Sequence, residues 1–200
     1  MQDKKGSEIM SDSIITKKAI AAGMKELTKN KNFDKITVSD IAEICGLNRQ
    51  TFYYHFQDKF ELVGWIYYNE IVSEIIKDLS YENATDKVLR MLVKMKNEDF
   101  FYINTLKASV ENEFREYLLQ ITSELFADII GRIAVEKEMK ESDRSFMADF
   151  YAYGIVGTII AWAHHGMKET PEYITEQLKK LAFGTEKFGY IRYNKKMQIN

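Results

Sequence analysis

Residues 37–59, TVSDIAEICGLNRQTFYYHFQDK, constrain the fold of this chain more than any other stretch. Apolar residues from Val38 to Cys45 recur at i, i+3, i+4 and i+7, which is the spacing of one buried helical face. Thr37, with Asp40 three residues later, predicts the start of that helix and Gly46 predicts its end. Asn48 is a favoured N-cap for a second helix. The stretch therefore predicts a helix, a tight turn and a second short helix.

The second helix has two distinct faces when its residues are placed at about 100° each around a helical axis. With Arg49 as zero, Phe52 and Phe56 point to about 300° and 340°, so they form one narrow inward stripe. Hydrogen-bonding side chains occupy the opposite face and its flanks. Apolar anchors behind and polar groups in front are the layout of a recognition helix that enters the major groove of DNA.

Eight side chains in and around this helix are predicted to contact DNA. A bare pair of helices would be weak evidence, since such turns also occur in helical proteins that never touch DNA. Arg49, Gln50 and Thr51 are expected to read base edges, and Tyr54 shares their face. The group expected to hold the phosphate backbone consists of Thr37, Tyr53, His55 and Lys59.

The same stretch resembles the DNA-binding signature of TetR-type bacterial transcriptional regulators. One position departs from that signature, because Gln50 stands where a small residue is common. The resemblance implies a dimeric, cytoplasmic regulator, and Gln50 implies an operator preference of its own. The matching residues are Ile41, Ala42, Gly46, Tyr53, Phe56, Asp58, Lys59 and Leu62.

Charge is distributed unevenly along the chain, whose net charge is -2. Residues 1–60 carry ten Lys or Arg against eight Asp or Glu, whereas residues 61–200 carry eighteen against twenty-two. This asymmetry is consistent with DNA contact at one end only. Cys45, the single cysteine, is expected to be a buried structural thiol in a reducing cytoplasm. The N-terminus lacks the apolar core of a signal peptide, and the uncharged residues 150–166 suit a buried helix better than a membrane span.

The predicted fold is all-α with about nine helices. Residues 1–60 are expected to form a helix-turn-helix DNA-binding domain with a disordered tail over residues 1–12, and residues 61–200 an effector-binding and dimerisation domain. A long helix from Lys59 to about Leu79 is expected to connect them. Further helices are expected over residues 85–97, 99–107, 111–136, 142–165 and 171–187.

The chain beyond residue 80 resembles the C-terminal domain of a TetR-type subgroup that includes regulators of dihydroxyacetone kinase operons. Two runs carry this resemblance, FFYINTLKASVENEFREYL and FYAYGIVGTIIAWAHHGMKETPE. The resemblance implies the fold of this half. It leaves the effector open between an unknown small molecule and a kinase-like protein partner.

Aromatic and methionine side chains between residues 91 and 162 are candidates for an apolar effector pocket. The existence of a pocket is implied by the family resemblance, and most such residues at helical spacing belong to a core instead. The candidates are Met91, Met95, Phe101, Tyr102, Phe114, Tyr117, Tyr151 and Trp162.

Gly154, Gly157 and Ala161 lie at i, i+3 and i+7 and form a smooth strip along one helix. The strip meets either a neighbouring helix of the same chain or, as the family resemblance implies, its own copy in a dimeric four-helix bundle. His164 and His165 diverge by about 100°, so they are not expected to share a metal ion. No metal site, cofactor or catalytic motif is predicted.

The sequence thus predicts a homodimeric DNA-binding transcriptional regulator that recognises an inverted-repeat operator, most often a repressor released by an effector. Two alternatives stay open. One is an activator whose effector is a kinase-like protein partner. The other is a helical ligand-binding protein with a vestigial DNA motif.

Overall fold

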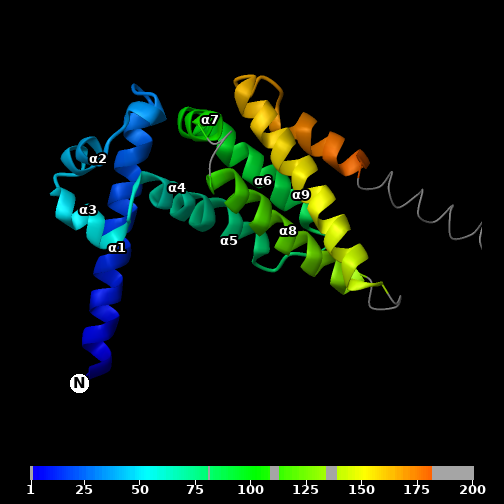
Figure 1. Ribbon diagram of the computed structural model, residues 1–200, viewed down its shortest axis with the longest axis horizontal. Coiled ribbons are helices and arrows are strands. Elements are labelled where there is room, and N and C mark those ends of the chain that lie inside the picture. Colours follow the sequence, from blue (N-terminus) through cyan, green and yellow to red (C-terminus); the bar gives the residue numbers. More distant parts are fainter. Residues whose placement is uncertain (1, 81, 109–112, 134–138, 182–200) are drawn as a thin grey trace, which may run out of the picture.

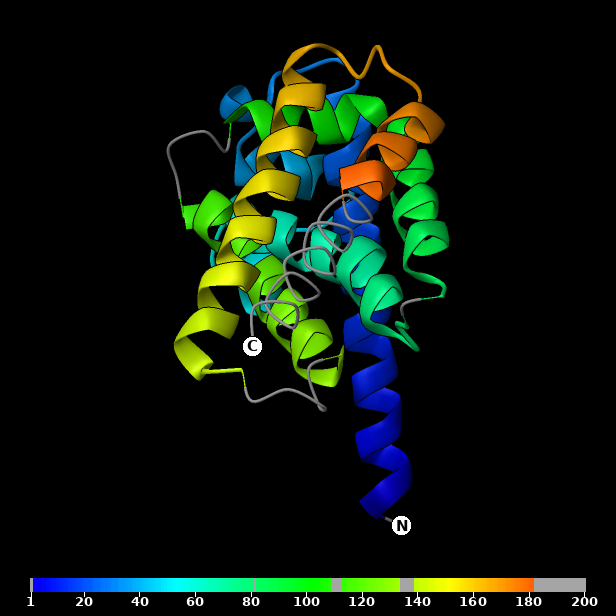
Figure 2. The same cartoon turned by 90° about the vertical axis from the view of Figure 1, so that its right-hand side faces the viewer.

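The computed structural model describes residues 2–80, 82–108, 113–133 and 139–181. Within these ranges the chain is helical and has no strand, as the sequence predicts. Figure 1 shows a slender N-terminal unit beside a larger group of helices, with α4 leading from one to the other. The N-terminal end of α1 projects away from both (Figures 1 and 2).

The N-terminal unit consists of α1 (Gln2–Thr28), the 3-10 turn η1 (Phe33–Lys35), α2 (Val38–Ile44) and α3 (Arg49–His55). The sequence predicts a disordered tail over residues 1–12, but the structure places residues 2–12 in the first turns of α1. No proline interrupts these residues, so the helix extends backwards from the part that packs against α2 and α3.

Side-chain caps determine where the short helices begin. Thr37 and Asp40 form a capping box at the start of α2: the Asp40 amide donates to Thr37 Oγ1 at 3.2 Å, and the Thr37 amide donates to Asp40 Oδ2 at 2.7 Å. Asn48 Oδ1 accepts the Thr51 amide at 2.7 Å and caps α3. Gly46, between the helices, has a φ of 63°, a conformation that favours glycine. These local predictions are confirmed.

The inward stripe of α3 anchors the N-terminal unit. Phe52 and Phe56 are buried with their ring centroids 5.9 Å apart, and Ile41 of α2 is buried in the same cluster. Burial of each such side chain contributes about 1.5–3 kcal/mol. α1 and α2 approach closely at Gly23, where a Cβ atom would lie 2.4 Å from Cys45 Sγ. The orientation of α2 and α3 therefore depends on α1.

A continuous helical segment leads out of the N-terminal unit and changes type along its length. α4 (Lys59–Tyr67) is followed by a π-helical stretch, η2 (Tyr68–Val72), and by α5 (Ser73–Ile76). The segment ends before the predicted Leu79, and Asp78 in the following turn has a φ of 54°. Such π-helical stretches are rare and frequently lie at functional sites.

Five described helices make up the larger group. α8 and α9 pack side by side along most of their length, and α7 also packs against α9 (Figures 1 and 2). Both ends of α6, α7 and α9 are described, and their bounds agree with the predicted ranges to within one residue. The predicted ends of α8 and of the last helix lie outside the described residues. The elements are α6 (Ala84–Asn97), α7 (Asp99–Ala108), α8 (Glu113–Ile133), α9 (Glu141–His164) and a helix over residues 171–181.

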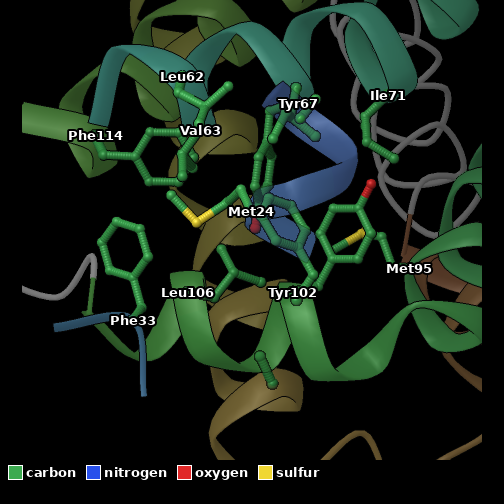
Figure 3. Close-up of a cluster of buried hydrophobic side chains, with 14 of the residues drawn as sticks. Met24, Phe33, Leu62, Val63, Tyr67, Ile71, Met95, Tyr102, Leu106 and Phe114 are labelled. Carbon is green, nitrogen blue, oxygen red and sulfur yellow. The ribbon is translucent and has the colours of Figure 1, made fainter. Parts of the chain in front are cut away.

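One apolar cluster joins the two groups (Figure 3). Met24 of α1 and Phe33 of η1 contribute from the N-terminal unit, Leu62 from α4, and Tyr102 and Leu106 from α7. All five side chains are buried. Because interiors of this kind are close-packed, a displacement of α7 is transmitted to α1 and α4.

The outer face of α9 is apolar and uncovered in the single chain. Among the described helices, α9 is the one long and apolar enough to cross a membrane. Core helices of soluble proteins can have the same length and composition. In this chain 28% of the apolar stretch of α9 is buried. Its inner face packs on α7 and α8. On the outer face Phe146, Phe150 and Tyr153 are 73%, 67% and 57% exposed. A contiguous apolar face of this kind typically marks an interaction surface.

Candidate nucleic-acid interface

α3 presents a shallow recess to solvent on the side away from its buried anchors. Tyr54 is 80% exposed and Tyr53 is 48% exposed, and Gln50 is exposed beside them. Four of the predicted DNA contacts therefore meet on one surface, together with the N-cap residue. The lining residues are Asn48, Gln50, Thr51, Tyr53 and Tyr54.

Hydrogen bonds hold several side chains of this face in place. Asn48 Oδ1 accepts the Thr51 amide at 2.7 Å and the Thr51 hydroxyl at 3.0 Å. Arg49 Nη2 donates to the Tyr53 hydroxyl at 3.4 Å, and the guanidinium carbon lies 5.9 Å from the centroid of the Tyr53 ring. Side chains that are already ordered lose less conformational freedom on binding, so this face is preorganised.

A basic pair lies at the end of α3. His55 is close enough to Lys17 of α1 to feel its charge, and the Lys17 ammonium lies 5.2 Å from the centroid of the Phe56 ring. Burial, and then the Lys17 charge, lower the pKa of His55 below its ordinary value. Both groups are suited to a phosphate, because an anion stabilises a protonated imidazole. The sequence did not predict Lys17, since it lies 20 residues before the motif and no spacing rule connects the two.

Lys59 does not extend outward as the sequence predicted. Its ammonium donates to the carbonyl oxygens of Phe33, Asp34 and Ile36 at 2.8, 3.3 and 3.0 Å, and it lies 4.5 Å from the centroid of the Phe33 ring. An ammonium has three N–H donors, so all of them are used within the protein. Burial lowers the pKa of Lys59. Lys59 therefore links the start of α4 to η1 through these hydrogen bonds. This placement corrects the phosphate contact that the sequence predicted for Lys59.

Thr37 is exposed at the start of α2, but its hydroxyl is already engaged. It donates to Asp40 Oδ2 at 2.8 Å and accepts the Asp40 amide. Lys31 donates to the same carboxylate at 2.7 Å. The hydrogen bond from Lys31, followed by those from Thr37, lowers the pKa of Asp40 to about 2. Thr37 therefore acts first as a helix cap, and its contact with a DNA backbone stays a prediction.

A recognition helix with buried aromatic anchors, preceded by a capped helix and a tight turn in an all-α chain, defines a helix-turn-helix DNA-binding protein. Residues 20–64 match the family described as bacterial regulatory proteins, TetR family. Residues 82–184 match a second family description, the C-terminal region of a transcriptional regulator. The chain therefore belongs to the TetR family of bacterial transcriptional regulators, whose members are soluble proteins that bind DNA operators as dimers.

Individual relatives agree with this assignment. The HTH-type dhaKLM operon transcriptional activator DhaS of Lactococcus lactis subsp. lactis (strain IL1403) is 28% identical over 152 residues, which cover 73% of this chain and 78% of the relative. The solved structure of the dihydroxyacetone kinase operon activator DhaS is similar with a TM-score of 0.68 at 25% identity, covering 88% of this chain and 98% of that one. Both the family and the subgroup predicted from the sequence are confirmed, and these relatives are regulators, not enzymes.

A more distant structure shows the fold alone. NalD, the secondary repressor of the MexAB-OprM multidrug efflux pump in Pseudomonas aeruginosa, is similar with a TM-score of 0.57 at 18% identity. The match covers 84% of this chain and 95% of NalD. The architecture of this chain is therefore shared by activators and repressors.

Most of the predicted pocket residues lie in the core that joins the two groups. Met95, Phe101, Tyr102, Phe114 and Trp162 belong to that cluster, with Met91 and Tyr117 packed against it. Tyr151 lies apart and stacks on Phe126 of α8, with ring centroids 5.3 Å apart. The contacts therefore support a core role for seven of the eight side chains, and an effector site among them stays a prediction.

The predicted dimer strip lies on the exposed outer face of α9. Gly154, Gly157 and Ala161 are exposed. A Cβ atom at either glycine would meet nothing within 4 Å. The strip therefore does not pack against another described helix of the same chain, and its role as a dimer seam stays a prediction.

A charged junction that the sequence did not predict ties α1 to the larger group. Lys25 Nζ lies 2.5 Å from Glu70 Oε2 in η2 and 2.5 Å from Glu98 Oε2 just after α6. Lys94 Nζ lies 3.2 Å from Glu70 Oε2 and 3.7 Å from Glu98 Oε1. Lys25 is separated from its two partners by 45 and 73 residues, so no local pattern predicts these contacts.

Proposed function

We propose that this chain is a homodimeric, cytoplasmic regulator that binds an inverted-repeat operator through α3, and whose DNA affinity changes when an effector binds the larger helical group. The exposed, preorganised face of α3 carries this proposal. An intact face of this kind also argues against a vestigial DNA motif. In the proposed complex base edges are read by Arg49, Gln50, Thr51 and Tyr54, and phosphates are held by Lys17, Tyr53 and His55.

The outer face of α9 is the proposed dimer seam. Two-fold symmetry across it would place two α3 helices for half-sites about one helical turn or a little more apart. Gly157→Arg puts a charge in the middle of this face and should give a monomer that has lost specific DNA binding. Ser145→Arg, exposed on another side of α9, is the matched control and should stay dimeric. Sedimentation and operator titration measure both, and a dimeric Gly157→Arg variant would remove this face from the interface.

The effector is proposed to act through the junction between the two groups. The shared core, the Lys25 ion pairs and the π-helical stretch η2 all connect α1 and α4 to α6 and α7. An effector that binds one arrangement of this junction better by about 1–3 kcal/mol changes DNA affinity about 5- to 150-fold. By the same linkage, DNA changes effector affinity by an equal factor.

Repression released by an effector is the first proposed mode of regulation, since a dimer on an operator blocks the DNA that it covers. Activation is the second candidate, favoured by the name of the relative DhaS, an operon activator. Its effector would be a kinase-like protein partner in place of a small molecule.

Transcription from a template that carries the selected operator distinguishes the two modes. A repressor lowers transcript yield in the absence of effector, and an activator raises it when the effector is present. The effector itself is tested by titrating a candidate with and without operator DNA. Equal affinity in both conditions would show that the candidate's site is not coupled to DNA and would favour the protein partner.

A further inference from the structure

Two hydroxyl groups in the recess of α3, those of Thr51 and Tyr53, are engaged in hydrogen bonds within the protein. The Thr51 hydroxyl donates to Asn48 Oδ1 at 3.0 Å, so the γ-methyl group of Thr51 is the part of that side chain free to meet DNA. The Tyr53 hydroxyl accepts from Arg49. Tyr54 contributes an exposed ring that stands edge-on to His55, with centroids 5.0 Å apart and an interplanar angle of 86°.

The major groove displays one apolar group, the C5-methyl group of thymine. An alkyl group and an aromatic ring that share one recess are suited to contact with that methyl group. Gln50 lines the same recess and carries an amide, which pairs with the N6 and N7 atoms of adenine. The recess therefore combines the two contacts that favour A·T pairs.

We infer that Thr51 and Tyr54 form a receptor for a thymine methyl group, and that each operator half-site carries a thymine whose methyl group enters this recess. The inference rests on the proposed DNA-binding function and adds the base that this surface selects. Gln50 supplies the adjacent adenine contact. The preference for thymine at this position then depends on one methyl group. Replacing thymine with uracil removes that methyl group and leaves every hydrogen-bonding group of the base in place.

The test uses the full chain and a duplex selected from random sequences for tight binding. Each thymine of the selected site is replaced in turn by uracil, which lacks only the methyl group. Burial of one methyl-sized group is worth about a fourfold change in affinity. Uracil at one particular position of a half-site should therefore weaken binding about fourfold. Replacement in both half-sites should weaken binding about 15-fold, because free-energy changes at distant sites add.

Variants connect the loss to the recess. Thr51→Ser keeps both hydrogen bonds to Asn48 and removes the methyl group, so it should bind the thymine and uracil duplexes nearly equally. Tyr54→Phe retains the ring and should keep the full preference for thymine. Gln50→Ala is the matched control, and it should weaken both duplexes by the same factor.

Uracil tolerated at every position would overturn the inference while leaving specific DNA binding intact. A thymine preference that persists undiminished in Thr51→Ser would also overturn it, since the methyl group would then be read elsewhere. Failure to select any duplex would instead refute the proposed function together with this inference.

Discussion

Replacing Lys59 with methionine separates two roles that its position allows. Methionine keeps an apolar side chain of similar length and removes the ammonium. The carbonyl oxygens of Phe33, Asp34 and Ile36 then lose their common donor, and the contact with the Phe33 ring is lost as well. Hydrogen bonds to a charged group contribute about 1.5–3 kcal/mol, and the three bonds to one partly buried ammonium are not independent.

We therefore expect Lys59→Met to lower the free energy of unfolding by about 1.5–3 kcal/mol. For a chain of this length the midpoint of thermal unfolding should fall by about 3–12 °C. The logarithmic dependence of operator affinity on salt should keep its wild-type slope, because no phosphate contact is removed. Lys35→Met is the matched control: Lys35 is exposed in the adjacent η1, and its loss should leave the thermal midpoint nearly unchanged.

The opposite pair of results would refute this reasoning. If Lys59 contacted one phosphate in each half-site, Lys59→Met would lower the salt slope by about 1.8 and leave the thermal midpoint close to that of the wild type. Thermal unfolding and DNA titration at several salt concentrations, both on the same preparation, distinguish the two outcomes.

Three further predictions concern the N-terminal unit. The pKa of Asp40 is about 2 in the folded protein against an ordinary 3.8, so the contribution of this carboxylate to stability is present above about pH 4 and is lost as the pH falls toward 2. Asp40→Asn should therefore reduce the change of the unfolding midpoint with pH between about pH 4 and pH 2. Gly23→Ala should destabilise the chain by about 1–3 kcal/mol in chemical denaturation, because the new Cβ atom overlaps Cys45 Sγ, and adding Cys45→Ala should recover part of the loss. His55, whose pKa is lowered in the free protein, should take up a proton when it meets a phosphate. Operator affinity should therefore rise as the pH falls through the pKa that His55 has in the complex, and His55→Gln should abolish that rise.

Local signals predicted the N-terminal unit well because each depends on residues within one or two helical turns. The pair Thr37 and Asp40 closes over three residues, and Asn48 caps α3 through Thr51 three residues later. The helices of the larger group followed from apolar periodicity for the same reason. The family resemblance likewise rested on the contiguous residues 37–59, and the subgroup resemblance rested on two contiguous runs beyond residue 80.

Contacts between distant residues were not predictable in this way. The spacing that places Lys59 at the start of α4 is the same whether its side chain extends to DNA or turns toward carbonyl oxygens 23 to 26 residues away. Periodicity likewise cannot distinguish a core residue from a pocket-lining one. Tyr102 and Phe114 both face inward, and their contacts with Tyr67, at centroid distances of 5.2 and 4.8 Å, are set by tertiary packing.

The strength of the Lys25 junction suits the proposed switch. The side chains of Lys25, Glu70 and Glu98 are 20%, 24% and 35% exposed. Each ion pair therefore lies between a surface pair, worth up to about 1 kcal/mol, and a buried pair, whose loss costs about 3–5 kcal/mol. An effector needs to favour one state by only about 1–3 kcal/mol, which is comparable to breaking one such pair. Separating the buried rings of Tyr67 and Phe114 costs more, since removing one large aromatic side chain from a core costs about 3–5 kcal/mol. An effector that moves α7 should therefore release α1 through the Lys25 contacts while the aromatic core stays assembled.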